Sequence, residues 1–416
     1  MSSASIPLTV TLSLGSQPIQ MAVAESLQRG GALRRILSFP AGVQIFDPVG
    51  IEALRLVRRY RRYELMNRLI WASWRRLPGS GRVWNMPLVA STAYADWLAS
   101  QWVPSSTIFH GWTGNSLACI KKARHHGSII MIEQVSMHPR EWKETVLEEC
   151  GRFGVRPRDC RAILPEPLMR RMEREYEMAD TILVPSQLAR MSFQRAGYGG
   201  RTVAVNAGVD HHFFAPPSMP APRDVFRVCY AGRVELPKGL PYLLQAWKQL
   251  GLAKAELVLI GEVAPEMHRF IGQWALPNVR LLGFLAPAEL AKWYRASHLF
   301  VFPSVNEGLA RVLFEAMSCG LPVVATERSG AEDCITPGVE GNVVPSRSTA
   351  ALAEAILWHF ENHEASVAMG KAARSRILHQ FTLPHYVERV IKVYLDAVAK
   401  SAKVNGHPEQ VRAVAS

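Results

Sequence analysis

The 416-residue sequence lacks the features that define several common protein classes. It has six cysteines, and because no two of them form a Cys-x-x-Cys pair, we expect neither a zinc site nor a disulfide framework. No apolar run reaches the ~18 residues that a transmembrane helix needs, and the N-terminus has no signal-peptide pattern. These absences predict a cytoplasmic protein.

Acidic residues are also in short supply. Asp and Glu together number 35 against 48 Lys and Arg, which leaves a formal net charge of +13. Most of this excess lies before residue 222, so the N-terminal half carries the basic character. A polyanion, an anionic lipid surface or a phosphorylated substrate would each suit that charge. The sequence shows no nucleic-acid-binding module with interleaved aromatic residues, so we expect no nucleic acid partner.

The composition that remains is that of a globular protein with two domains. Hydrophobic residues make up 48% and charged residues 20%, and the length exceeds that of one ordinary domain. Strand and helix patterns alternate, which predicts an α/β fold with parallel sheets. Four prolines close together mark the boundary. We predict a first domain over 1–215, a linker over 216–222, a second domain over 223–384, a helix over 385–400 and a flexible tail over 401–416.

The most informative stretch, Leu299 to Glu332, reads LFVFPSVNEGLARVLFEAMSCGLPVVATERSGAE. Its pattern predicts a strand, a helix that starts near Gly308, and a second strand, which together form a βαβ unit. Glu307 then lies at the N-terminus of the helix and Glu315 lies two turns later. In open α/β sheets this carboxyl edge of the strands is where ligands bind.

This pattern resembles the donor-site signature of retaining glycosyltransferases of family 4, which have the GT-B fold. The shared features are two glutamates with seven residues between them and the following Ala-Met-Ser-Cys-Gly-Leu-Pro-Val-Val-Ala. The resemblance is strong from about Asp180 to Leu395 and weaker before that. It implies two Rossmann-like domains that face each other across a cleft, a nucleotide-sugar donor, a saccharide or lipid-linked acceptor, and retention of stereochemistry.

The resemblance also implies roles for individual residues. Glu307 and His110 are the expected catalytic residues, with His110 at the carboxyl end of a strand over 107–110 and near the donor sugar. The expected donor-binding residues are Gly232, Arg233, Lys238, Gly308, Leu309, Glu315 and Glu332. The acceptor-side candidates are Gly15, Glu133, Ser186 and Asp210. The sequence departs from the family in having Gly15 alone, where members often have a glycine pair.

The sequence contains no Asp-x-Asp pair, the usual ligand set that holds a divalent metal against a diphosphate. Arg233 and Lys238 follow a predicted strand, and arginine can bind phosphate oxygens in a bidentate way. The N-terminus of the helix after Glu307 also favours negative charge. We therefore expect no metal and no other cofactor.

Two segments admit more than one interpretation. The predicted helix Glu52–Leu77 carries eight arginines between residues 55 and 76 against one acid, Glu64, beside an apolar stripe with Trp71 and Trp74. It is either a core-packing helix with a solvated basic face or a helix that contacts an anionic membrane surface, on the inner face of the plasma membrane. The segment 141–167 is predicted to be an insertion that either binds the acceptor or only elaborates the surface.

Two other functions remain open. A nucleotide-sugar epimerase of the same architecture would need acid–base carboxylates near the first domain's cleft, for which Asp96 and Glu133 are weak candidates. A catalytically inactive homologue that binds glycans or polyanions is the other alternative. The presence of His110, Arg233, Lys238, Glu307 and Glu315 argues against inactivity.

Overall fold

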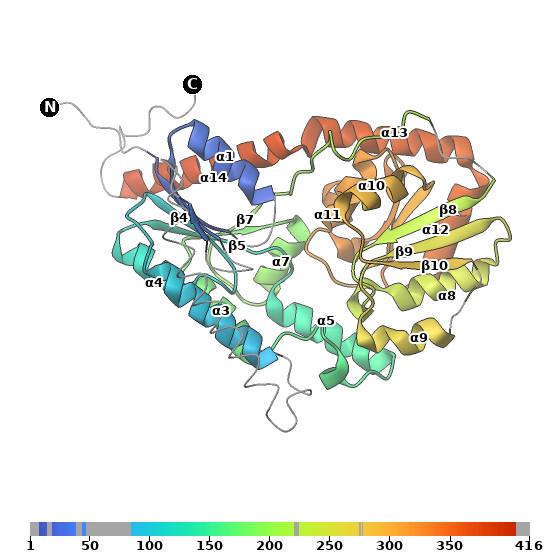
Figure 1. Ribbon diagram of the computed structural model, residues 1–416, viewed down its shortest axis with the longest axis horizontal. Helices are drawn as coiled ribbons and strands as arrows, with labels where there is room; N and C mark the ends of the chain where they lie inside the picture. Colours follow the sequence, from blue (N-terminus) through green and yellow to red (C-terminus); the bar gives the residue numbers. More distant parts are fainter. Residues whose placement is uncertain are drawn as a thin grey trace.

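The computed structural model describes residues 8–14, 19–38, 44–46, 85–219, 224–273, 276 and 278–404. Gly15 and the arginine-rich segment 52–77 lie outside the described residues, as do part of the predicted linker and most of the predicted tail. In Figure 1 two β-sheets lie side by side, each with helices packed around it. Within the described residues, no helix is both long enough and apolar enough to cross a bilayer.

The first sheet has seven strands in the order β3-β2-β1-β4-β5-β6-β7. All neighbouring pairs are parallel except β2 and β3, which are antiparallel. Its strands are β1 (Val10–Leu14), β2 (Leu33–Ser38), β3 (Gln44–Phe46), β4 (Ile108–Trp112), β5 (Ile129–Glu133), β6 (Thr181–Val184) and β7 (Thr202–Ala204). Its helices are α1 (Ile19–Arg29), α3 (Asn85–Ser100), α4 (Leu117–His125), α5 (Pro139–Arg152), α6 (Glu166–Glu177) and α7 (Gln187–Arg195).

The second sheet has six strands, all parallel, in the order β10-β9-β8-β11-β12-β13. Its strands are β8 (Phe226–Ala231), β9 (Ala255–Ile260), β10 (Val279–Gly283), β11 (Leu299–Phe302), β12 (Val323–Thr326) and β13 (Gly341–Val344). The α-helices after the linker are α8 (Leu240–Leu250), α9 (His268–Gln273), α10 (Pro287–Arg295), α11 (Arg311–Ser318), α12 (Thr349–Glu361), α13 (His363–Gln380) and α14 (Leu383–Val404). The predicted α/β class with a parallel sheet in each half is confirmed.

The strand orders determine where ligands can bind. In each sheet the order reverses beside its first strand, between β1 and β4 in one and between β8 and β11 in the other. Loops diverge at such a reversal and leave a crevice at the carboxyl ends of the strands. The crevice of the first sheet therefore lies at the edge that carries Glu133, at the end of β5. The crevice of the second sheet lies at the edge that carries Glu307, after β11.

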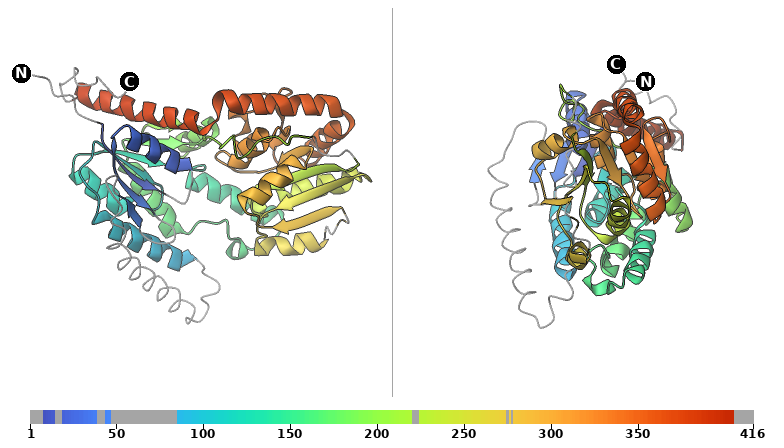
Figure 2. Two further views of the ribbon diagram at one scale, coloured as in Figure 1. Left: turned by 45° about the horizontal axis from the view of Figure 1, so that its top comes forward. Right: turned by 90° about the vertical axis from the view of Figure 1, so that its right-hand side faces the viewer.

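Helix α14 returns the chain to the first domain. It begins two residues before the predicted helix 385–400 and continues to Val404. Tyr386 and Tyr394 on this helix share a buried core with Val10 and Ile19 of the first domain. Figure 1 and Figure 2 show α14 lying beside α1 after α13 has run over the second domain.

The chain passes between the two domains twice, and the two connecting segments, near Val209 and near Thr382, are in contact. The Val209 amide donates to the Phe381 carbonyl (2.9 Å), and the Leu383 amide donates to the Val209 carbonyl (3.2 Å). A Cβ at Gly208 would lie 2.5 Å from the Thr382 carbonyl oxygen, so this contact requires glycine. The outgoing and returning chains therefore form one paired connection.

The packing of helix α5 contradicts the second interpretation offered for the segment 141–167, that it only elaborates the surface. Its residues Val146 and Cys150 are buried in the same hydrophobic cluster as the core of the second domain. The Tyr242 hydroxyl of α8 donates to Glu149 Oε2 (2.9 Å), and Arg347 Nε donates to Glu149 Oε1 (2.7 Å). The segment is thus more than a surface elaboration, because its helix packs into the second domain, and the acceptor-binding interpretation stays a prediction.

Three local expectations were wrong. Strand β4 continues to Trp112, so His110 lies in the middle of the strand and not at its end. Helix α11 begins at Arg311, three residues after its predicted start near Gly308, so Glu307 lies in the loop four residues before the helix. Asp96 is buried and its carboxylate accepts from the amides of Ala118 (2.6 Å) and Cys119 (3.1 Å), which makes it a cap for α4 rather than an acid–base candidate.

Candidate active site

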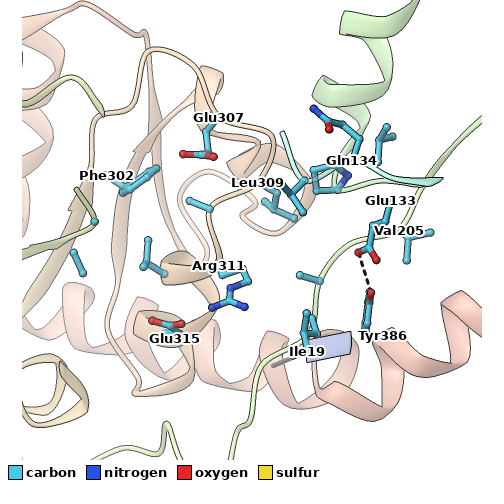
Figure 3. A pocket seen from close by; sticks show the side chains of 18 of the residues that line it. Ile19, Glu133, Gln134, Val205, Phe302, Glu307, Leu309, Arg311, Glu315 and Tyr386 are labelled. Atoms are coloured by element: carbon cyan, nitrogen blue, oxygen red, sulfur yellow. Dashed lines mark hydrogen bonds between the residues drawn. The ribbon is translucent and has the colours of Figure 1, made fainter. Parts of the chain in front are cut away.

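The carboxyl ends of the two sheets line one cavity of about 600 Å³, called here the central cavity. Figure 3 shows Glu133 and Tyr386 on one side of it and Glu307, Arg311 and Glu315 on the other. Of the residues predicted from the sequence, Glu133, Gly232, Arg233, Lys238, Glu307, Leu309 and Glu315 line this cavity.

Glu307 and Lys238 form an ion pair at the centre of the second domain's wall. The Lys238 ammonium donates to Glu307 Oε2, and each side chain is 14% exposed. The ammonium also lies 5.9 Å from the ring centre of Phe302 and 5.8 Å from that of Trp142. Because both charges are largely withdrawn from water, a polar ligand that enters here meets them with little screening by solvent.

The backbone around this pair depends on glycine. Gly239, just after Lys238, has φ +70°, and a Cβ there would lie 1.9 Å from the Pro303 carbonyl oxygen. Gly308, just after Glu307, packs against the first domain, where a Cβ would lie 2.6 Å from Ser136 Cα and 2.8 Å from Pro185 Cγ. These close approaches hold Lys238 and Glu307 against each other and against the first domain.

Arg233 is the most accessible charge of the site. It is 55% exposed, and its Nη1 lies 3.2 Å from Glu235 Oε2. It follows Gly232, whose φ of +142° favours glycine and whose added Cβ would lie 2.9 Å from the Tyr230 hydroxyl. A long exposed guanidinium at the end of β8 can turn toward an anion that enters the cavity.

Arg311 is a cation that our sequence reasoning missed. It lies in the first turn of α11 and lines the central cavity together with Glu315, one turn further along the helix. Burial raises the pKa of Glu315, while the positive charge of Arg311 and a hydrogen bond from the Tyr294 hydroxyl (3.2 Å to Oε2) oppose that rise. The sequence did hold a signal, because arginine in a helix's first turn is opposed by the helix dipole and needs another reason to be there.

His110 does not line the central cavity. Its ring is buried within the first sheet, its Nδ1 lies 2.7 Å from the Tyr394 hydroxyl, and its Nε2 lies 3.6 Å from Glu133 Oε2. Burial lowers the pKa of His110 to about 4, so the imidazole is neutral near pH 7. The structure places His110 behind Glu133 and outside the lining of the central cavity, and its predicted catalytic role stays a prediction.

Three more predicted residues have roles at the domain boundary or outside the cavity. Ser186 is buried, caps α7, and donates through Oγ to the Gly308 carbonyl (2.5 Å). Asp210 accepts from the amides of His212 (3.1 Å) and Phe213 (3.0 Å) in a turn. Glu332 is exposed and lines neither the central cavity nor the two spaces that join it.

Two further spaces join the central cavity. The distal cavity, about 760 Å³, shares Arg233, Arg311 and Glu315 with it and continues to Gly261, Glu262, Phe284 and Leu285 at the ends of β9 and β10. The Trp142 cavity, about 550 Å³, shares Trp112, Val135, Arg233 and Glu307 with it. Arg233 therefore lines all three spaces.

Comparison with known proteins finds a family to which part of the second domain is similar. Residues 225–362, which hold Arg233, Lys238, Glu307 and Glu315, match the family described as glycosyl transferases group 1. This part of the second domain is therefore similar to group 1 glycosyl transferases. D-inositol 3-phosphate glycosyltransferase 1 of Catenulispora acidiphila is 30% identical to the chain over 219 residues, which are 48% of this chain and 52% of that protein. The putative colanic acid biosynthesis glycosyltransferase WcaL of Escherichia coli is 29% identical over 220 residues, 50% of this chain and 54% of its own.

The alignments thus span about half the length of these curated relatives. Solved structures extend the likeness of the fold over nearly the whole chain. A sucrose-phosphate synthase from Thermosynechococcus elongatus has a TM-score of 0.66 at 17% identity and covers 94% of this chain and 99% of its own. Anabaena HepE in complex with UDP and glucose has a TM-score of 0.61 at 17% identity and covers 93% and 99%. The predicted GT-B architecture is confirmed.

The close approach at Gly308 predicts how the packing of the two domains responds to one added methyl group. Gly308→Ala puts a Cβ where backbone atoms of the first domain now lie, so the domains must separate. We expect a larger radius of gyration by small-angle X-ray scattering and a loss of stability of about 1–3 kcal/mol in urea unfolding. Gly151→Ala, at an exposed helical site with nothing within 4 Å, is the matched control and should leave both unchanged or raise stability slightly. Equal scattering from the two variants would contradict the packing described.

Proposed function

We propose that this protein transfers a sugar from a nucleotide-sugar donor to a saccharide or lipid-linked acceptor, with retention and without a metal ion. The observation that carries the proposal is the Glu307–Lys238 ion pair in a cavity that also contains Arg233, Arg311 and Glu315. The family match of the second domain supports it, and so does the likeness in fold to a protein solved with UDP and glucose.

The three connected spaces suit the three parts of such a reaction. The distal cavity takes the nucleoside, with Glu315 available to accept from ribose hydroxyls. Arg233 and Arg311 then meet the diphosphate where the distal and central cavities join. The sugar lies in the central cavity against Glu307, and the acceptor approaches from the first domain. The bond from the anomeric carbon to the phosphate oxygen breaks, the acceptor oxygen bonds to that carbon on the same face, and its proton passes to the departing phosphate oxygen.

The cations explain how the leaving group is stabilised. Breaking the bond to the anomeric carbon leaves negative charge on the departing nucleoside diphosphate. Two guanidiniums and the Lys238 ammonium lie along its expected path, and cations held in place where negative charge develops stabilise that charge. They perform the task that a metal held by an Asp-x-Asp pair performs in other transferases.

The Trp142 cavity supports an acceptor with an apolar part. It meets the central cavity at Glu307, and most of its wall is apolar: Met137, Trp142, Ile163, Leu164, Leu168 and Met172. Val135, 42% exposed, lies where the two cavities join. A lipid-linked sugar fits this arrangement, with its hydroxyls at the central cavity and its apolar group beside Trp142. The likeness to WcaL favours a role in making cell-surface polysaccharide or glycolipid.

The two alternatives gain less support. An epimerase needs a pair of acid–base groups around the sugar, but Asp96 is buried away from the central cavity and leaves Glu133 without a carboxylate partner on the described first-domain wall. Withdrawing the charges of Glu307 and Lys238 from water costs solvation free energy. An inactive homologue would not need such a pair.

Substitution of Glu307 tests the proposed reaction. Glu307→Gln keeps the shape but removes the charge that accepts from sugar hydroxyls, and hydrogen bonds to charged groups are worth ~1.5–3 kcal/mol. We expect transfer from a panel of nucleotide sugars to fall at least tenfold, with folding retained by circular dichroism. Glu289→Gln, which breaks an exposed ion pair with Lys292, is the control and should transfer normally. Near-normal turnover by the Glu307 variant would refute the assignment.

Chelation tests the proposed independence from metal. Transfer should continue at an unchanged rate in excess EDTA, because the cations are supplied by side chains. Arg311→Gln should raise the donor KM at least tenfold by removing a charge-assisted hydrogen bond to phosphate. Activity that disappears on chelation and returns with magnesium or manganese would overturn this part of the proposal.

The proposal includes attachment to an anionic membrane through residues 52–77, and it rests there on sequence alone. Each basic residue near an anionic surface contributes ~1 kcal/mol, and salt screens this attraction over ~8 Å at physiological ionic strength. We expect co-sedimentation with anionic but not neutral vesicles, lost at high salt. Replacing Arg58, Arg59, Arg61 and Arg62 by glutamine should abolish it. Equal, salt-insensitive recovery with both vesicle types would count against the membrane role.

A further inference from the structure

We propose that Glu133 binds a hydroxyl group of the acceptor and that Tyr386, from the last helix, positions it for that contact. The inference rests on the proposed glycosyl transfer and assigns the first domain's part in it. Glu133 ends β5, Tyr386 lies in α14, and both line the central cavity. Figure 3 shows the hydrogen bond between them on the wall that faces Glu307 and Arg311.

Glu133 is the one charged side chain that the described residues of the first domain contribute to the central cavity. Its Oε1 accepts from the Tyr386 hydroxyl (3.0 Å), and its Oε2 accepts from Gln20 Nε2 of α1 (3.0 Å). A carboxylate has about four acceptor positions, so each oxygen keeps capacity for a further donor. The two bonds fix the plane of the carboxylate and leave it able to accept from a ligand.

A second layer supports this arrangement from behind. Tyr394 is buried, and among the described residues His110 Nδ1 is the acceptor available to its hydroxyl proton. The neutral imidazole then carries its own proton on Nε2, which has no hydrogen-bond partner among the described residues and lies 3.6 Å from Glu133 Oε2. That proton directs positive potential at the carboxylate. His110 is thus a supporting group for Glu133.

Burial and hydrogen bonding act in opposite directions on the pKa of Glu133. Burial raises its pKa, whereas the hydrogen bonds from Gln20 and Tyr386 lower it. On α14, Tyr394 also interacts electrostatically with the Glu133 carboxylate. The charge of Arg389, on the same helix, acts on Tyr386. Loss of a single donor therefore shifts the pKa of Glu133 upward, because less remains to offset burial.

The negative charge of Glu133 indicates whether it binds the donor or the acceptor. A carboxylate repels the diphosphate of the donor, which the cations Arg233 and Arg311 on the opposite wall attract. It attracts a neutral hydroxyl group, which can donate a hydrogen bond to it. The acceptor enters from the side of the first domain, so its reacting hydroxyl, or one next to it, is the group that binds Glu133.

Tyr386→Phe tests the positioning role, because it removes one hydroxyl and keeps the buried ring. We expect the acceptor KM to rise about two- to tenfold, the loss expected for one hydrogen bond. The acid limb of the pH profile for kcat/KM of the acceptor should move to higher pH. Glu133→Gln should raise the acceptor KM at least tenfold and abolish that limb. In both variants, hydrolysis of the nucleotide sugar in the absence of acceptor should fall by a smaller factor than transfer to the acceptor does.

Tyr198→Phe is the matched control, since its hydroxyl bonds the Tyr176 carbonyl (3.1 Å) away from the cavity, and it should change none of these values. An unchanged acceptor KM in both the Tyr386 and Glu133 variants would overturn the inference. So would a loss of donor hydrolysis equal to the loss of transfer, because Glu133 would then serve the donor. A wild-type protein that neither hydrolyses nor transfers any sugar would instead refute the proposed function and the acceptor role with it.

The hydrogen bond between Tyr386 and Glu133 can also be tested through the pH dependence of stability, without measuring enzymatic turnover. Because the folded-state pKa of Glu133 is raised, its contribution to stability is fully present below the unfolded pKa and is lost as pH rises through the folded value. The difference in stability between wild type and Glu133→Gln should therefore decline with rising pH. In a Tyr386→Phe background that decline should extend to higher pH. Identical pH dependence in the two backgrounds would show that Tyr386 does not hold the carboxylate.

Discussion

The close contact between the two domains at Gly308 is the constraint on which the site depends. The backbone there lies so near Ser136 and Pro185 that no side chain fits, and Ser186 donates to the Gly308 carbonyl across the boundary. This contact brings the carboxyl ends of the two sheets to opposite walls of one cavity. Without it, Glu133 and Glu307 would belong to separate surfaces, each open to water, where charged groups act weakly.

The domains also exchange structural elements. Helix α14 comes last in the chain and covers the first sheet, while α5 belongs to the first half of the chain and packs into the second core. Glu141 at the start of α5 pairs with Arg195 of the first domain (2.9 Å) and with Arg328 of the second (2.7 Å). These exchanged helices hold the cavity walls from both sides, and they place Tyr386 from one end of the chain against Glu133 from its first half.

The sequence predicted the parts of the site that lie in one continuous segment. The βαβ pattern between 299 and 326 located Glu307 and Glu315, because hydrophobic periodicity and parallel connectivity place them at a strand edge. Arg233 and Lys238 were found for the same reason. His110 was misplaced because strand ends are uncertain by a few residues and a two-residue extension moves a side chain away from the edge. Tyr386 and Gln20 could not be found, since each meets Glu133 through tertiary packing across more than a hundred residues.

The packing of α5 limits how the protein can be divided. A cut in the predicted linker would separate the second domain from Val146 and Cys150, which complete its core, and from Glu149, which bonds Tyr242. The same cut would remove α14 from the first domain and uncover the apolar residues around Val10. Each half expressed alone would expose surface suited to aggregation. A chimera that exchanges donor domains between relatives would therefore have to carry α5 and α14 with the partners they cover, and a single crossover point in the linker would not suffice.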